Sequence, residues 1–76
     1  MSAPHELAED FPGQGERIRT LRDGDLHFRK LTDSYHDLNR AIARAEARID
    51  VIDEAEETRL RRERVALKDE IARYLG

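Results

Sequence analysis

The most regular feature of the sequence is a long segment in which apolar or small residues recur at alternating intervals of three and four. This spacing runs without a break from Phe28 to Ile52 and is typical of a helix that packs along one face against another helix. Charged residues fill many of the positions between, so the opposite face is expected to be solvated. A single helix cannot bury so long a stripe, and the pattern therefore predicts a second helix beside it.

That second helix is indicated by a similar apolar pattern between Leu60 and Tyr74. The spacing shifts between Ile52 and Leu60, and Asp53 and Glu56 are spaced as in a capping box, which marks the start of a helix. We therefore predict an all-α fold: an antiparallel, coiled-coil-like helical hairpin of residues 25–51 against residues 55–75, preceded by a short helix. Because no Gly or Pro lies between Asp25 and Leu75, one continuous helix that dimerises along its length is the alternative. The residues expected to form the helix-packing seam, and to support self-association, are Phe28, Leu31, Tyr35, Leu38, Ile42, Ile49, Leu60, Leu67, Ile71 and Tyr74.

Ahead of the hairpin, the chain is expected to divide at Phe11-Pro12, because proline disfavours a helical conformation in the residue before it. Residues 1–10 are predicted to be a flexible arm or a short amphipathic turn, and residues 11–76 to form the hairpin domain. Ile18 and Leu21 indicate a short helix over residues 16–23. Gly24 is expected to end this helix in a left-handed conformation, and Asp25 to cap the next one.

Composition limits the classes of protein that fit this pattern. The chain has 76 residues, no cysteine, 41% charged residues and a net charge of −3. A core this small supplies only about 3–5 kcal/mol, so a partner that buries further apolar surface is expected. No apolar run approaches the ~20 residues of a transmembrane helix, and the acidic first ten residues do not resemble a signal peptide. We expect a cytoplasmic protein without membrane contact.

The sequence offers little for catalysis or metal binding. It has no thiol and no glycine-rich phosphate loop, and His5, His27 and His36 lack the spacing of a helical metal pair. Paired carboxylates are common along the chain, but a two-helix hairpin is not expected to enclose the pocket that catalysis requires. We predict a protein that is not an enzyme and has no cofactor, no metal site and no small-molecule substrate.

A cluster of basic residues at the start of the last helix raises nucleic-acid binding as an alternative function. The candidate phosphate contacts are Arg59, Arg61, Arg62 and Lys68. Glutamates lie among these residues, however, and mixed signs on a helix face usually indicate ion pairs within the helix. A weak nucleic-acid or nucleoid accessory role is therefore the less favoured reading.

Arg64 occupies a seam position where an apolar residue is expected, and it would need a carboxylate partner. One register of the hairpin places Arg64 opposite Ala45 and Ile71 opposite Leu38, and there Glu46 is the candidate partner for a buried ion pair. The capping box at Asp53 favours an earlier turn, which would pair the first helix with residues nearer the start of the second. The sequence leaves both registers open.

The order of several motifs resembles the YdcH family of small bacterial proteins. The motifs are Phe11-Pro12, Ile18, Leu21, Asp25-Leu26-His27-Phe28, Tyr35, Leu38, Ile42, Glu46 and Leu67-Lys68-Asp69-Glu70-Ile71. The resemblance implies a helical hairpin with a short N-terminal helix and carries no activity, cofactor or substrate. Gly13, Gly15, Thr32 and Asn39 depart from the usual pattern, and the two glycines leave open whether the short helix packs tightly.

Pattern, composition and resemblance together predict a non-enzymatic structural or protein-interaction module that acts through helix–helix packing. Its expected partner is a second copy, giving a homodimer, or a larger protein. The cellular process is not indicated by any motif.

Overall fold

Two aspartates define where the long helices begin. The computed structural model describes the backbone of residues 3–76 and the side chains from Leu7 onward. Asp25 accepts a hydrogen bond from the backbone N–H of Phe28 at 3.0 Å and caps helix α3, Leu26–Glu46. Asp53 accepts one from the N–H of Glu56 at 2.8 Å and caps helix α4, Glu54–Leu75. Both caps were predicted, although the Glu56 carboxylate binds Arg59 instead of completing the capping box.

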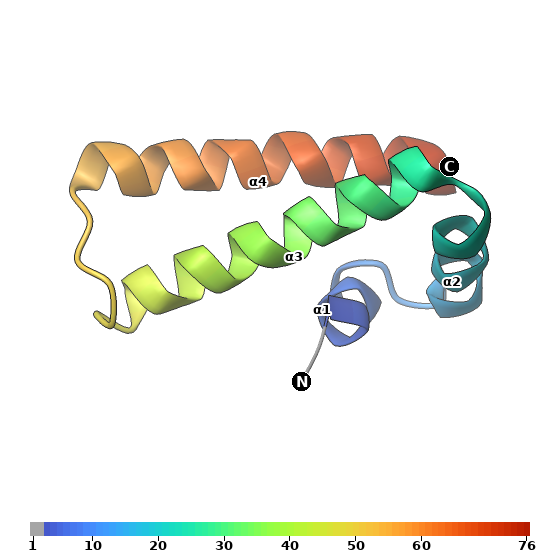
Figure 1. Ribbon diagram of the computed structural model, residues 1–76, viewed down its shortest axis with the longest axis horizontal. Coiled ribbons are helices and arrows are strands. Elements are labelled where there is room, and N and C mark those ends of the chain that lie inside the picture. The colour runs from blue at the N-terminus through green and yellow to red at the C-terminus, as the bar shows by residue number, and fades with distance from the viewer. Residues whose placement is uncertain (1–2) are drawn as a thin grey trace.

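Helices α3 and α4 form the predicted antiparallel hairpin (Figure 1). Helix α3 ends at Glu46, five residues earlier than expected, and residues 47–53 form the connecting loop. The alternative of one continuous helix is therefore excluded. The ring centroids of Phe28 and Tyr74 lie 5.0 Å apart. This pairing agrees with the register of the earlier turn, the one favoured by the capping box. The register that places Ile71 opposite Leu38 would pair Phe28 with a position beyond Gly76, and it is wrong.

Helix α2, Gly15–Gly24, packs across the start of α3 through the buried side chain of Ile18. The short helix was predicted, but the way it ends was not. Gly24 does not adopt the expected left-handed conformation. The helix ends at Asp25 instead, whose backbone N–H donates the last hydrogen bond of the helix to the Leu21 carbonyl at 2.8 Å. The one glycine in this region with a positive φ is Gly13, at 82°, which turns the chain into α2.

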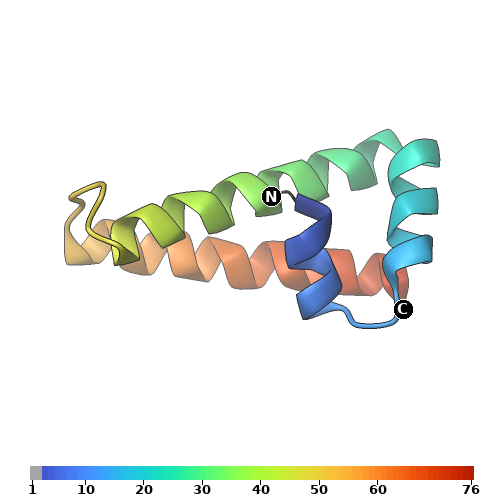
Figure 2. The ribbon, with the colours of Figure 1, turned by 90° about the horizontal axis from the view of Figure 1, so that it is seen from below.

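Residues 3–10 form a helix, α1 (Ala3–Asp10), where a flexible arm or amphipathic turn was predicted. Residues 1 and 2 of that prediction lie outside the described part of the chain. Figure 2 shows α1 lying across the hairpin near its middle. Leu7 is 1% exposed. Burial of this one side chain stabilises the packing of α1, a helix of eight residues whose composition is otherwise mostly polar or small.

A polar contact joins α2 to α3 beside this packing. Thr32 is fully buried. Its hydroxyl donates to the backbone carbonyl of Arg29 at 3.0 Å and accepts a hydrogen bond from Arg22, whose guanidinium also binds Asp33 at 2.9 Å. The threonine is therefore satisfied, and through Arg22 it links α2 to α3.

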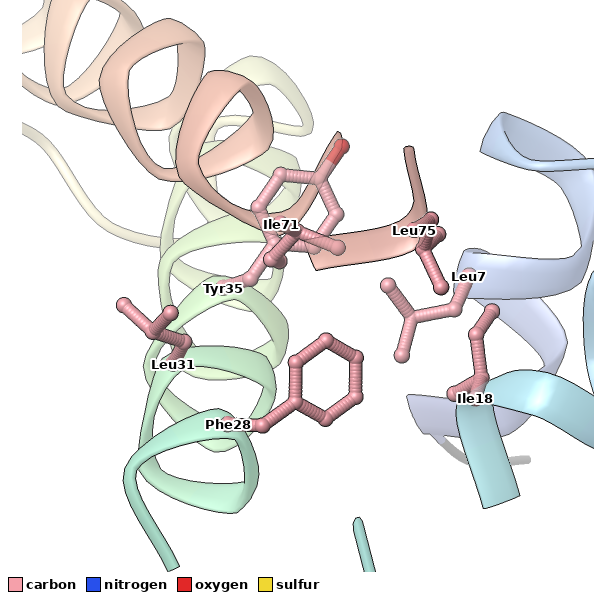
Figure 3. Close-up of a cluster of buried hydrophobic side chains, with 7 residues drawn as sticks. All are labelled: Leu7, Ile18, Phe28, Leu31, Tyr35, Ile71 and Leu75. Carbon is pink, nitrogen blue, oxygen red and sulfur yellow. The ribbon is translucent and has the colours of Figure 1, made fainter. Parts of the chain in front are cut away.

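Side chains from all four described helices meet in one core cluster (Figure 3). The cluster lies at the end of the hairpin opposite the loop, where α1 and α2 cover the start of α3 and the end of α4. Its buried members are Leu7, Ile18, Phe28, Leu31, Tyr35, Ile71 and Leu75. The other half of the hairpin, toward the loop, depends on the contact between α3 and α4 alone.

Candidate interaction surface

The predicted seam is better buried on α3 than on α4. Phe28, Leu31, Tyr35, Leu38, Ile42 and Ile71 are buried, whereas Leu60, Leu67 and Tyr74 are only half-buried. Ile49 was predicted to be a seam residue and is instead 62% exposed, because α3 ends before it. The seam thus leaves apolar surface uncovered in its loop half.

The loop that contains Ile49 has a defined conformation. Arg48 has a φ of 63°, a left-handed conformation that ends α3 and is usual for glycine. Arg44 Nε lies 2.9 Å from Asp50 Oδ2, and Arg44 Nη2 lies 3.2 Å from Asp50 Oδ1. This two-point contact, with the backbone N–H of Ile49 bound to the Arg44 carbonyl at 2.9 Å, holds the loop against the end of α3.

A groove runs along the hairpin between α1 and the loop, with a volume of about 480 Å³. The sequence did not predict it, because it exists only where α1 crosses the helix pair. Its floor is apolar, formed by Ile42, Ala43 and Val65, and Val65 is 60% exposed. The other residues that line it are Glu9, Asp10, Tyr35, Asn39, Glu46, Arg64 and Lys68.

Tyr35 and Asp10 form the wall of the groove nearest the core cluster. The Tyr35 hydroxyl donates a hydrogen bond to the Asp10 carboxylate, and Lys68 Nζ lies 4.0 Å from the same carboxylate. Burial, and then the hydrogen bond to Asp10, raises the pKa of Tyr35 to about 12. The phenol is therefore protonated at neutral pH and acts as a hydrogen-bond donor.

The predicted ion pair between Glu46 and Arg64 differs from the structure. Glu46 Oε2 lies 2.7 Å from Arg61 Nη2, and Arg64 Nη1 donates instead to Asn39 Oδ1 at 3.3 Å. Arg64 has a different partner from the predicted one because the turn is earlier. The earlier turn places Arg64 opposite the middle of α3 and not opposite Ala45. Arg64 lines the groove, and none of the described carboxylates lies within ion-pair distance of it.

The candidate nucleic-acid contacts are mostly engaged by acids of the same chain. Arg59 binds Glu56 at 2.6 Å and Glu63 at 3.3 Å, while Arg61 binds Glu46 and also Glu57 at 3.0 Å. Hydrogen bonds to Glu56 and to Glu46 raise the pKa of the two guanidinium groups. Arg62 is exposed on the outer face of α4, and Lys68 lies in the groove. The four side chains do not form one continuous basic surface.

Other kinds of site find no support in the described part of the chain. No group of three or more histidine, aspartate or glutamate side chains there is arranged to hold a metal ion. His5 lies outside the described side chains. None of the helices described is both long and apolar enough to cross a bilayer.

A comparison with protein families identifies the hairpin itself. A family described as a protein of unknown function (DUF465) matches residues 28–75, which cover nearly all of α3, the loop and all of α4. The chain belongs to the DUF465 family. This family is the YdcH-type group of small helical proteins, so the resemblance seen in the sequence is confirmed. The comparison with curated proteins found no match, and neither did that with solved structures.

Membership in DUF465 supplies no site residues, so the surface rests on the geometry alone. Sequence reasoning missed two of its parts: the groove and the Arg61–Glu46 pair. The groove depends on Leu7, a single leucine in an acidic segment, which carries no periodic signal. Arg61 and Glu46 lie 15 residues apart in the sequence, so no local pattern indicates that they meet.

Proposed function

We propose that this DUF465 chain is a non-enzymatic protein-interaction module that acts through helix packing, with a second copy or a larger protein as its partner. The observation that carries the proposal is the apolar surface at the loop half of the hairpin. Ile49, Val51 and Val65 are 62%, 92% and 60% exposed, beside seam residues that are only half-buried. We infer that these exposed apolar residues belong to a contact surface.

The size of the core supports the same proposal. The core cluster occupies one end of the hairpin, and a chain of 76 residues has little other apolar surface to bury internally. A partner that covers the loop half would bury the exposed residues and lengthen the core along the seam. Two hairpins related by a two-fold axis would do so with a single interface.

The groove favours binding over catalysis. Two of its acids are already engaged by side chains of the same chain, since Glu46 is bound to Arg61 and Asp10 accepts a hydrogen bond from Tyr35. The raised pKa of Tyr35 removes it as a base at neutral pH. Among the described residues that line the groove there is no serine, threonine, cysteine or histidine to act as a nucleophile or proton carrier.

Two measurements on the purified full chain test this proposal. Sedimentation equilibrium should give a mass near twice 8.8 kDa at high micromolar concentration, or affinity capture from a native lysate should recover a stoichiometric protein that survives nuclease treatment. A monomer at every concentration, together with recovery that disappears on nuclease treatment, would overturn the proposal and favour the nucleic-acid alternative.

A further inference from the structure

The loop presents two branched apolar side chains on a fixed backbone. Val51 is almost fully exposed and Ile49 largely so, although the loop is held by the contact between Arg44 and Asp50. A left-handed residue at Arg48 adds conformational cost to this arrangement. A loop that is held so that its apolar side chains face water is expected where those side chains dock against another surface.

The loop also carries negative charge that the chain does not neutralise. Residues 49–58 contain five acids and no basic residue. Asp50, Glu56 and Glu57 bind Arg44, Arg59 and Arg61 respectively. Asp53 and Glu54 are exposed and form no ion pair with a described residue, so the acids next to Val51 are available to a cationic surface.

The groove offers a complementary surface on the same molecule. Its apolar floor is formed by Ile42, Ala43 and Val65. Along its α4 wall lie Arg64, which donates to the neutral amide of Asn39, and Lys68, whose ammonium forms a long ion pair of 4.0 Å with Asp10. The acids of the groove lie on the other walls, where Glu46 and Asp10 are engaged by Arg61 and Tyr35, and Glu9 belongs to α1.

The positions of loop and groove suit a reciprocal contact. Glu46 lines the groove and is also the last residue of α3 before the loop, so the two surfaces adjoin. Ile42 lies four residues, or about 6 Å of helix, from that end. A two-fold axis between loop and groove would place the loop of each copy on the groove of the other, with both contacts formed at once.

We propose that the occupant of the groove is the loop of a second copy: Ile49 and Val51 of one copy pack on Val65 and Ala43 of the other, and Asp53 and Glu54 face Arg64 and Lys68. This inference rests on the proposed function and specifies which surfaces of the chain form the contact. Helix α1 contributes Glu9 and Asp10 to the groove, so it limits how far the partner's loop can reach toward the core cluster.

Sedimentation equilibrium on single variants of the full chain tests the apolar part. Val51→Ser in the loop and Val65→Ser in the groove should each weaken dimerisation about tenfold or more, because each removes a buried apolar contact. Leu26→Ser is the matched control, since Leu26 is 63% exposed at the other end of the hairpin. All three positions are exposed, so circular dichroism should show unchanged helix content in each monomer.

A charge exchange tests the orientation. Lys68→Glu and Glu54→Lys should each weaken the dimer, and the double variant should recover most of the lost affinity, because it restores opposite charges across the interface. A dimer that is insensitive to Val51→Ser and Val65→Ser, or equally sensitive to Leu26→Ser, would overturn the loop-in-groove contact. A monomeric chain that still captures a nuclease-resistant protein would overturn it as well, yet leave the proposed function standing.

Discussion

The hydroxyl of Tyr35 donates a hydrogen bond to the carboxylate of Asp10, and this bond joins the last residue of α1 to the middle of α3. Tyr35 is 2% exposed, so its hydroxyl depends on this contact in place of water. Together with Leu7, the bond positions α1 across the hairpin and thereby forms one wall of the groove.

Tyr35→Phe should lower the free energy of unfolding by about 0.5–1.5 kcal/mol, because it removes the hydrogen bond to Asp10 and keeps the ring. Tyr74→Phe is the matched control, since the Tyr74 hydroxyl makes no hydrogen bond to a described residue. Urea unfolding followed by circular dichroism measures both. Equal effects of the two substitutions would show that the Asp10 bond does not stabilise the fold.

Stability should fall at alkaline pH. Burial and Asp10 raise the pKa of Tyr35 to about 12, above the ordinary value of about 10 that the unfolded chain has. The neutral phenol therefore contributes fully below pH ~10, and this contribution is lost as the pH rises toward 12, where the unfolded state releases its proton first. Urea midpoints measured across this range should drop less for Tyr35→Phe than for the wild type. In Tyr35→Phe the urea midpoint should still fall somewhat with rising pH because of Tyr74. The pKa of Tyr74 is also raised, by burial and by the nearby Asp25 and Glu70.

A double-mutant cycle distinguishes the two possible partners of Glu46. The cycle of Glu46→Ala with Arg61→Ala should give a coupling energy of about 0.2–1 kcal/mol, because both side chains are about half-exposed. The cycle of Glu46→Ala with Arg64→Ala should give a coupling near zero. The opposite ranking would restore the register in which Arg64 lies opposite Ala45.

Arg48→Gly should raise the free energy of unfolding by about 0.5–1 kcal/mol, since glycine adopts the left-handed conformation of this position without steric cost. Arg48→Ala removes the same side chain but keeps the Cβ atom, and its stability should stay near that of the wild type. Thermal melts at several protein concentrations measure both variants. If alanine stabilised as much as glycine, the gain would come from the lost charge.

The sequence predicted the long helices well because their signals are local and repeated. Each buried residue of α3 from Phe28 to Ile42 is separated from the next by one helical turn or less, and Asp25 and Asp53 are strong caps directly before their helices. Family membership was predicted for the same reason, since the motifs lie on these two helices.

Features set by a single residue or by distant contacts were not predictable. The end of α3 depends on Arg48, which carries no sequence signal for a left-handed conformation. α1 depends on Leu7, the only large apolar residue between Ala3 and Asp10. The partners of Glu46 and Arg64 depend on the register, which is fixed where Phe28 meets Tyr74 at the far end of the hairpin.

The location of the core cluster at one end gives the hairpin an uneven resistance to hydrogen exchange. Amides in the first turns of α3 and the last turns of α4 lie beside the cluster and should exchange only when the whole chain unfolds. Amides near Glu46 and Glu54 are held by one helix contact and should exchange through local opening. The loop end can therefore adjust its shape against another surface while the opposite end retains its packing.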